Sequence, residues 1–339
     1  AMNVAQRSTS EPNLGTADGY FTVDRFSIDM GGTTDGRFTM SQDSSAPSGF
    51  ANSLKFDCTT ADTSTAADEK LILVQDIEGQ NLQAFAKGTS DAKPFAVSFY
   101  VKGNASATYT CELFDNDNSR VNAKTFSVTT DWTRVELTFV ADTTGALDDD
   151  NALSFALNIV LHAGSNFTSG TLSTTWTSVT SANRHVGISS FFDSTSRTFF
   201  LTGLQMEVGQ NPTEFEHEPV ERTLSKCQRY YFKFLEGATK EIGPGWFYNA
   251  TYMSTIFRFP TTMRATPTAT STSGTNMYII YRENAGDGFD DLTFENGSTE
   301  QYSAYNSDEV GSATAGAAGI VRSHPSAGGS AKVEFAAEL

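Results

Sequence analysis

Residues 95–101 read Phe-Ala-Val-Ser-Phe-Tyr-Val, and this stretch decides the fold class. Apolar side chains at every second position place Phe95, Val97, Phe99 and Val101 on one face of an extended strand. The same reading fits 135–139, 153–161 and 199–206, and 71–77 is a further strand. Clusters of Gly, Asn, Asp, Ser and Thr, which favour turns, separate these runs, and the best helix candidate is a short stretch at 81–87. The sequence therefore predicts an all-β fold, an antiparallel jelly-roll-like sandwich.

The length of the chain, 339 residues, exceeds the roughly 100–200 residues of an ordinary domain, so two domains are expected. Residues 211–220, Asn-Pro-Thr-Glu-Phe-Glu-His-Glu-Pro-Val, read as an extended connector, because proline lacks an amide donor and disfavours helix in the preceding residue. The predicted division is an N-terminal arm at 1–19, a jelly roll at 20–210, a connector at 211–222 and a second, smaller β-sandwich domain at 223–339.

The second domain has strand candidates at 227–234, 245–259, 276–282 and 332–336. Its Gly/Ala/Ser-rich segment 311–319 is read either as a mobile loop or as backbone that packs closely in an oligomer.

The charge balance limits the classes of partner. The chain has 23 basic and 40 acidic residues, a formal charge of −17, and lacks a Lys/Arg cluster, so we expect no nucleic-acid ligand. Apolar runs fall short of the roughly 18 residues that span a bilayer, so membrane insertion is not expected either. Cys58, Cys111 and Cys227 lie far apart without C-x-x-C spacing, which predicts buried free thiols.

Enzymatic motifs are absent from the sequence. It contains no H-E-x-x-H, G-x-S-x-G or phosphate-binding loop, and its four histidines are scattered, so we predict a protein that is not an enzyme. A glycan depolymerase remains the less favoured alternative, because two carboxylates that meet in space can cleave a glycosidic bond.

Acidic turns raise the question of a metal ion. Asp115 and Asp117 could supply oxygen ligands to Ca²⁺, but Arg120 stands where the EF-hand turn needs glycine. We therefore expect no cofactor and read these residues as solvated acidic turns, with a calcium site as the disfavoured alternative.

Aromatic residues at turns are the candidates for ligand contact, because exposed rings stack on the CH groups of sugars. Trp246 follows Gly243-Pro-Gly245 and precedes Phe247, Tyr248 and Tyr252 in the second domain, although Trp246 can equally pack under the turn or between subunits. Trp176 lies in a Ser/Thr-rich stretch that gives no reason to bury it, so we expect it to be exposed. The loop tips at 284–291 and 296–305, which hold Tyr302 and Tyr305, are second choices.

Several distinct short motifs are spread over nearly the whole chain. They are Ala1-Met-Asn-Val-Ala-Gln-Arg7, Gly19-Tyr-Phe-Thr-Val-Asp-Arg25-Phe26, Leu73-Val-Gln-Asp-Ile-Glu78, Leu201-Thr-Gly-Leu-Gln-Met-Glu-Val-Gly209 with Pro212-Thr-Glu-Phe-Glu216, Cys227-Gln-Arg-Tyr-Tyr231, Phe259-Pro-Thr-Thr-Met-Arg-Ala-Thr-Pro267 and a terminal Ala-Ala-Glu-Leu339. In order and spacing they resemble phage tail-fibre and minor tail proteins, with Phe26 where that family commonly has Trp. We read Asp24, Arg25, Glu78 and Glu207 within these motifs as structural charges that require buried partners.

The resemblance implies a carbohydrate-binding-module-like jelly roll followed by a distal, receptor-facing tip, assembled as a homotrimer on the virion after synthesis in the host cytoplasm. It also implies a proximal fibre segment before residue 1 and a host partner, either a surface glycan or an outer-membrane receptor. The expected function is host attachment through a glycan. A purely structural virion component, whose aromatic residues all lie in cores or interfaces, is the alternative.

Overall fold

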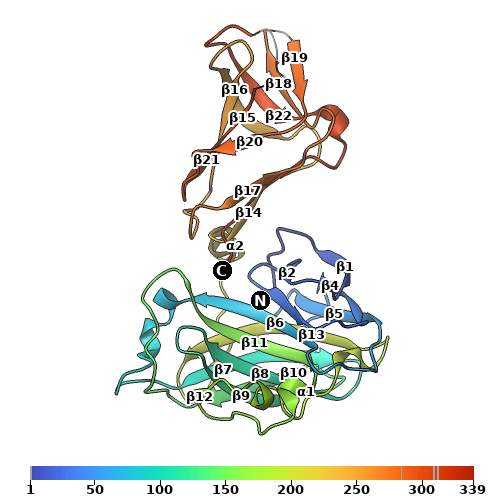
Figure 1. Ribbon diagram of the computed structural model, residues 1–339, viewed down its shortest axis with the longest axis vertical. Coiled ribbons are helices and arrows are strands. Elements are labelled where there is room, and N and C mark those ends of the chain that lie inside the picture. Colours follow the sequence, from blue (N-terminus) through green and yellow to red (C-terminus); the bar gives the residue numbers. More distant parts are fainter. Residues whose placement is uncertain (1, 284, 308–309, 311–312) are drawn as a thin grey trace. The chain divides into compact units, whose positions relative to one another are not determined.

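The chain is all-β in a computed structural model that describes residues 2–283, 285–307, 310 and 313–339. It divides into two compact units, unit 1 up to Val220 together with Leu339, and unit 2 at Glu221–Glu338 (Figure 1). Each unit has its own hydrophobic core, so each is described by itself.

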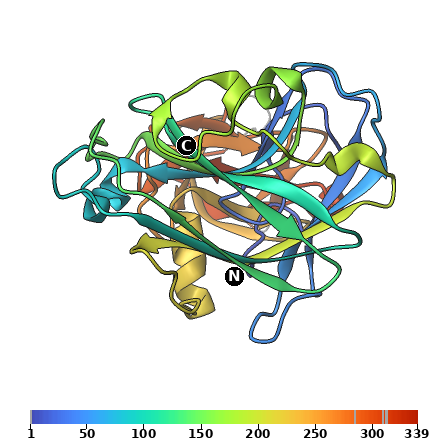
Figure 2. The same ribbon diagram turned by 90° about the horizontal axis from the view of Figure 1, so that it is seen from below.

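Unit 1 is a sandwich of two antiparallel sheets, visible as layers of strands in Figures 1 and 2. The six-stranded sheet has the order β1 (Ser10–Leu14), β4 (Arg37–Asp43), β5 (Ser53–Thr60), β13 (Thr198–Val208), β7 (Phe95–Gly103) and β10 (Thr133–Phe139). The seven-stranded sheet has the order β12 (Thr177–Ser178), β9 (Arg120–Val128), β8 (Ala107–Asp115), β11 (Leu153–Ala163), β6 (Lys70–Glu78), β3 (Ser27–Gly31) and β2 (Gly19–Tyr20).

The alternating apolar side chains of β7 face the core, as the sequence predicts. Phe95, Val97, Phe99 and Val101 are fully buried and pack with residues of both sheets. Complete burial of such a side chain contributes about 1.5–3 kcal/mol, so this strand is a major source of stability. Strand β11 departs from simple alternation, since residues 154–162 are buried on both faces. A long loop that follows β11 is the reason, because Gly164 and Ser189 hydrogen-bond to other parts of unit 1 at either end of it.

Short helical segments interrupt the strands. Helix α1 (Ser165–Thr168) lies in this loop, and 3₁₀ turns occur at Ser181–Asn183 and Phe191–Asp193. The helix candidate at 81–87 proves to be part of two consecutive 3₁₀ turns, Gly79–Asn81 and Gln83–Phe85. Cys58, Cys111 and Cys227 are buried thiols, as predicted.

The N-terminal segment is integrated into unit 1. Strand β1 pairs with β4, and Met2 and Leu14 are part of the hydrophobic core, whereas we had expected an arm over 1–19. Within that range Ala1 lies outside the described residues.

The segment 211–217 packs back onto unit 1. The backbone N–H and hydroxyl of Thr213 both donate to the carboxylate of Glu207, and Phe215 lies against Phe50 with ring centroids 5.1 Å apart. Helix α2 (Val220–Gln228) follows, where the sequence suggested connector and then strand from residue 227. Pro219 precedes the helix, and Glu221 and Lys226 lie in its first and last turns, where their charges favour the helix dipole.

Unit 2 contains a three-stranded and a seven-stranded sheet. The first has the order β14 (Tyr231–Glu236), β23 (Lys332–Ala336) and β17 (Thr268–Ser271). The second has the order β19 (Ala285–Phe289), β18 (Tyr278–Arg282), β22 (Ala318–Ser323), β15 (Glu241–Phe247), β16 (Met253–Arg258), β21 (Gln301–Asn306) and β20 (Thr293–Glu295). The predicted strands at 276–282 and 332–336 correspond to β18 and β23.

Two of the loop predictions fall partly outside the described residues. Residues 311–312 of the Gly/Ala/Ser-rich segment and Asn284 of the loop tip 284–291 are not described. The rest of that tip includes β19, and the end of the Gly/Ala/Ser-rich segment enters β22. No helix among the described residues is long and apolar enough to cross a membrane.

Candidate functional site

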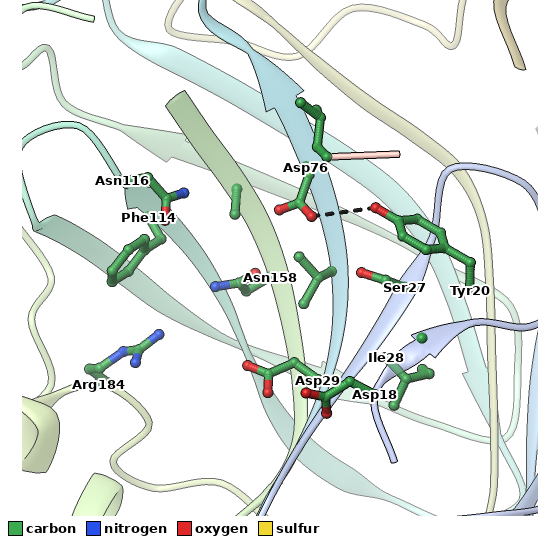
Figure 3. A pocket seen from close by; sticks show the side chains of 14 residues that line it. Asp18, Tyr20, Ser27, Ile28, Asp29, Asp76, Phe114, Asn116, Asn158 and Arg184 are labelled. Atoms are coloured by element: carbon green, nitrogen blue, oxygen red, sulfur yellow. Dashed lines mark hydrogen bonds between the residues drawn. The ribbon is translucent and has the colours of Figure 1, made fainter. Parts of the chain in front are cut away.

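A pocket of about 450 Å³ opens on the face of the seven-stranded sheet of unit 1 that points away from the core (Figure 3). Its position follows from strand register. Asn158 in β11 lies opposite Glu112 in β8 and Val74 in β6, Val74 lies opposite Ser27 in β3, and Ser27 lies opposite Tyr20 in β2. Residues directly opposite each other project from the same face of a sheet. With strands about 4.8 Å apart, this row of five residues extends over about 19 Å.

A second row of opposite residues lies beside the first. It adds Ala156 to the apolar floor of the pocket and contributes the ring of Phe114. Phe114 in β8 lies opposite Ala156 in β11, which lies opposite Asp76 in β6. Val74 and Ala156 are small buried residues, so the sheet leaves space above them between the larger side chains of Phe114 and Tyr20 (Figure 3).

Arg184 enters the pocket from the loop that follows β11. Its Nε and Nη2 donate to the two carboxylate oxygens of Glu112 at 2.9 and 2.6 Å, and its guanidinium carbon lies 4.9 Å from the centre of the Phe114 ring. Glu112 is completely buried, and the Nδ2 of Asn158 donates to it at 2.9 Å. A bidentate ion pair of this kind fixes the plane of the guanidinium, so Arg184 is a rigid part of the pocket wall.

Two asparagines of the pocket carry unpaired polar atoms. Asn116 follows β8, and its backbone N–H is fixed to the carbonyl of Ser154 at 2.9 Å. The Nδ2 of Asn116 and the Oδ1 of Asn158 are buried and lack a hydrogen-bond partner among the described residues. A buried polar atom without a hydrogen-bond partner lowers stability by about 1–3 kcal/mol. These two atoms therefore mark a place where a ligand can supply the missing hydrogen bonds.

Three carboxylates also line the pocket, those of Asp18, Asp29 and Asp76. Asp18 accepts a hydrogen bond from the backbone N–H of Met30 at 2.6 Å, and Asp29 pairs with Lys70 at 2.6 Å. The hydroxyl of Tyr20 is 3.5 Å from Oδ2 of Asp76 (Figure 3). The pocket thus combines amide, carboxylate and guanidinium groups with two aromatic rings around a small apolar floor.

None of these pocket residues was among the ligand candidates from the sequence. The available signal was the presence of polar residues inside apolar strands, such as Asn158 in Leu153–Ala163 and Glu112 in Ala107–Asp115. That signal marks a polar patch but gives no register, so it cannot show that the residues meet.

Four of the predicted aromatic residues come together on one face of unit 2. Trp246 in β15 lies opposite Ser254 in β16, which lies opposite Tyr305 in β21. The ring of Tyr252 stacks on Tyr305 with centroids 4.7 Å apart, and Tyr248 lies 6.1 Å from Tyr252. Trp246 is 39% exposed and Tyr248 is 76% exposed. We call Trp246, Tyr248, Tyr252 and Tyr305 the aromatic group of unit 2.

Three other aromatic candidates are structural. Phe247 is 1% exposed because it alternates with Trp246 and faces the core of unit 2. Tyr302 is partly buried and packs on that core against Phe294 and Phe335. Trp176 was expected to be exposed, but it is partly buried against the core of unit 1, and its Nε1 donates to the carbonyl of Val140 at 2.8 Å.

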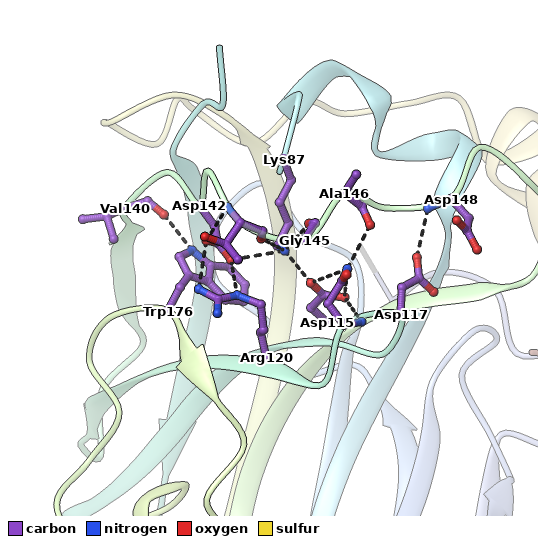
Figure 4. A network of polar contacts seen from close by, with 12 residues as sticks. Lys87, Asp115, Asp117, Arg120, Val140, Asp142, Gly145, Ala146, Asp148 and Trp176 are labelled. Carbon is purple, nitrogen blue, oxygen red and sulfur yellow. Dashed lines mark hydrogen bonds and ion pairs between the residues drawn. The ribbon is translucent and has the colours of Figure 1, made fainter. Parts of the chain in front are cut away.

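The predicted calcium ligand Asp115 belongs instead to a buried network in which a lysine provides the cation (Figure 4). Nζ of Lys87 contacts Oδ2 of Asp115 and, at 3.2 Å, Oδ2 of Asp142, and it donates to the carbonyls of Thr144 and Gly145 at 3.1 and 2.8 Å. Lys87 and Asp115 side chains are completely buried. The carboxylate of Asp115 is therefore already neutralised, and the interpretation of Asp115 as a solvated turn residue is wrong.

Asp117 is separated from this network. It is exposed, and its Oδ2 accepts a hydrogen bond from the backbone N–H of Asp148 at 3.0 Å (Figure 4). Across the described residues, no cluster of three or more His, Cys, Asp or Glu side chains is arranged to hold a metal ion.

The charges within the family-like motifs have protein partners. Asp24 is buried and accepts a hydrogen bond from the backbone N–H of Gln6 at 2.8 Å, and Arg25 donates to the carbonyl of Asp76 at 2.6 Å. Gln80 donates to Glu78, and Glu207 holds Thr213. The contacts of Asp24 and Arg25 connect segments that are distant in sequence, whereas those of Glu78 and Glu207 are local, and all four agree with a structural role.

No protein-family model and no curated protein sequence matches this chain. Solved structures with a similar arrangement of strands include the enzymatically active domain of tailspike protein 4 of bacteriophage CBA120, at 10% identity and a TM-score of 0.30, over 54% of this chain and 19% of that one. They also include a family 11 carbohydrate-binding module from Clostridium thermocellum in complex with a β-1,3-1,4-mixed-linked tetrasaccharide, at 12% identity and a TM-score of 0.29, over 62% of this chain and 99% of that one.

A third similar structure is a family 61 carbohydrate-binding module in complex with β-1,4-galactotriose, at 9% identity and a TM-score of 0.30, over 54% of this chain and 88% of that one. The match spans about a fifth of the tailspike chain. At these identities the similarity concerns the strand architecture alone.

Proposed function

We propose that unit 1 is a glycan-binding module whose site is the pocket on its seven-stranded sheet. The observation that carries this proposal is the pair of unpaired amide atoms, Nδ2 of Asn116 and Oδ1 of Asn158, in the pocket wall. One atom is a donor and the other an acceptor. A sugar hydroxyl both accepts and donates a hydrogen bond, so hydroxyls of one glycan can satisfy both atoms.

The remaining lining suits the same class of ligand. A pyranose has apolar CH faces and a polar edge, and the pocket has the small apolar side chains of Val74 and Ala156 between the rings of Phe114 and Tyr20. Polar groups at fixed positions around an apolar floor are typical of sites for small ligands. In this proposal the chain binds the glycan without cleaving it.

The wider role that we propose is host attachment by the distal part of a phage tail fibre, in the form of a homotrimer joined to a proximal fibre segment. It is supported by the order and spacing of the family-like motifs, such as Gly19–Phe26 and Cys227–Tyr231. In such an assembly several weak sites act together, because binding at one site makes binding at the next intramolecular. The aromatic group of unit 2 offers a second surface for contact with the host.

The proposed glycan site is tested by removing the two asparagine side chains that carry the unpaired atoms. We expect the full chain to bind members of a glycan array, and the double variant Asn116→Ala/Asn158→Ala to bind the same glycans about tenfold or more weakly, because each lost hydrogen bond is worth about 0.5–1.5 kcal/mol. Titration calorimetry with the best glycan measures the change. Asn166→Ala, at an exposed asparagine of unit 1 outside the pocket, is the matched control.

Melting curves of both variants show whether unit 1 remains folded. A folded double variant that binds as tightly as the wild type would remove the pocket from the proposal. A wild-type chain that binds no glycan on the array would favour a purely structural role.

The aromatic group of unit 2 is tested separately, by adsorption of the chain to host cells. We expect Trp246→Ala and Tyr248→Ala to reduce cell adsorption several-fold while glycan binding by unit 1 is unchanged, because both rings are exposed on unit 2. Ile320→Ala, at another exposed apolar residue of unit 2, is the control for a loss of non-specific hydrophobic adsorption. Equal adsorption by all three variants would place the host contact elsewhere.

A further inference from the structure

The two asparagines of the pocket that carry unpaired atoms belong to rows on either side of Ala156. Phe114 lies opposite Ala156, and continuing this register by two residues places Asn116 opposite Ser154. The hydrogen bond from the backbone N–H of Asn116 to the carbonyl of Ser154, 2.9 Å long, agrees with that placement. Ser154, Ala156 and Asn158 alternate with core residues and so share one face of β11. Four residues of a strand extend over about 13 Å, so Asn116 and Asn158 are separated by about that distance along β11.

The hydrogen-bonding role of Asn158 is fixed by its neighbour. Its Nδ2 donates to Glu112 at 2.9 Å, and Glu112, which also pairs with Arg184, can only accept. The amide therefore cannot be turned around, and Oδ1 is left as an acceptor without a partner among the described residues. Asn158 is 5% exposed and lines the pocket, so a ligand is needed to supply the missing donor.

Asn116 supplies the opposite role. Its Nδ2 is a buried donor without a partner among the described residues, and Asn116 also lines the pocket (Figure 3). Between the two amides lies the small apolar side chain of Ala156, which is 5% exposed. The pocket therefore presents a donor, a methyl-sized apolar surface and an acceptor in adjacent rows of the sheet.

An acetamido group has the matching set of groups. Its carbonyl accepts a hydrogen bond, its N–H donates one, and it carries a methyl group. In a trans amide the carbonyl and the N–H point in opposite directions, so one rigid group can serve a donor on one side and an acceptor on the other. A hydroxyl has its donor and acceptor on the same oxygen. The separation of Asn116 from Asn158 along β11 therefore favours the amide over a single hydroxyl.

From these contacts we infer that the pocket recognises an N-acetylated amino sugar. Its acetamido carbonyl accepts from Nδ2 of Asn116, its N–H donates to Oδ1 of Asn158, and its methyl group packs on Ala156. This inference rests on the proposed glycan-binding function and adds the class of sugar.

The experiment compares sugars that differ only in the substituent at C2. An array presents acetamido sugars and their hydroxyl counterparts in the gluco and galacto series, and triacetylchitotriose and cellotriose are one such pair. Titration calorimetry then measures both members of the pair that the full chain binds best. We expect the acetamido form to bind at least about tenfold more tightly, because its hydroxyl counterpart loses a hydrogen bond and the methyl contact together.

Asn116→Asp tests the donor at nearly constant volume. A carboxylate oxygen cannot donate to the acetamido carbonyl, whereas a sugar hydroxyl can turn and donate to the carboxylate. The ratio of the acetamido to the hydroxyl affinity should therefore fall several-fold toward one. Asn166→Asp introduces the same charge at an exposed asparagine outside the pocket and should keep the wild-type ratio.

Ala156→Val tests the place of the methyl group by a different change. Valine is well tolerated in strands, and its two additional methyl groups occupy the space that the acetamido methyl would use. We expect this variant to weaken binding of the acetamido form several-fold more than binding of the smaller hydroxyl form. Melting curves of the variants show that unit 1 remains folded.

The two proposals fail in different ways. Equal affinity of the wild type for both members of the pair, or array binding confined to sugars without an acetamido group, would overturn the sugar class while glycan binding stands. A wild-type ratio in Asn116→Asp and Ala156→Val would overturn the contacts assigned to these residues. A chain that binds no glycan would overturn both proposals together.

Discussion

Replacing Lys87 with methionine is expected to lower the free energy of unfolding of unit 1 by about 3–5 kcal/mol, because it removes one partner of a buried ion pair. The side chains of Lys87 and Asp115 are completely buried, and Asp142 is 4% exposed. Methionine fills a similar volume but leaves Asp115 without a counter-ion. The carbonyls of Thr144 and Gly145 also lose their donor (Figure 4).

Asp142 is less affected, because a second cation holds it. Nε and Nη2 of Arg120 donate to its two oxygens at 2.8 and 3.0 Å. Burial raises the pKa of Asp142, but hydrogen bonds from Arg120 and Thr144 and the charge of Lys87 outweigh this effect and keep its pKa below the ordinary value. The loss in Lys87→Met should therefore arise mainly at Asp115.

Denaturant unfolding followed by circular dichroism measures the loss. Lys55→Met, which removes a more exposed pair with Asp57, is the matched control and should cost no more than about 1 kcal/mol. The double variant Lys87→Met/Asp115→Asn should recover much of the loss, because it removes the uncompensated charge as well. A Lys87→Met protein as stable as Lys55→Met would show that the network does not stabilise unit 1.

The strands were predictable because their signal is local. Residues 95–101 and 332–336 alternate between apolar and other side chains. This period of two can be recognised in the sequence without knowing which strand pairs with which. Helix α2 was missed because it is only nine residues long, and Pro212 and Pro219 ahead of it indicated an extended segment.

The candidate site depends on register, which a single sequence does not contain. Asn158 and Glu112 are 46 residues apart, and Arg184 and Glu112 are 72 apart, yet both pairs are in hydrogen-bond contact. Lys87 meets Asp115 in the same way, so the Asp-rich turn looked solvated in the sequence while a distant lysine neutralises it. Trp176 was misread for a related reason. Its Ser/Thr-rich segment has no apolar pattern, but the fold places the ring about 6 Å from Phe95 and Phe155.

Acidification is expected to destabilise unit 1 through protonation of His185. Neither the proposed pocket chemistry nor the core requires this residue to be charged. Its side chain is completely buried, both ring nitrogens lack a hydrogen-bond partner among the described residues, and Nδ1 lies 3.9 Å from Glu112. Burial lowers the pKa of His185 to about 4 from an ordinary 6.5, against the attraction of Glu112 and in the same direction as the repulsion by Arg184. The folded protein therefore keeps this ring neutral.

The sign of the pH effect follows from this pKa. The unfolded chain binds a proton at His185 below pH 6.5 and the folded chain only near pH 4, so the unfolded state binds more protons in between. The free energy of unfolding should be highest above pH 6.5 and fall by about 3 kcal/mol as the pH drops to 4, since one pKa unit corresponds to about 1.4 kcal/mol. Loss of ionised carboxylates adds to this mainly at lower pH.

Denaturant unfolding of unit 1 at several pH values between 7 and 4 tests the effect. His185→Phe keeps an apolar ring beside Phe167 and should flatten the pH dependence between pH 6.5 and 4.5, even where it changes the stability at neutral pH. His217→Gln, at an exposed histidine of the same unit, is the matched control. Because the slope counts protons taken up on unfolding, it separates titration from packing. An equal slope in His185→Phe and the wild type would assign the acid sensitivity to other groups.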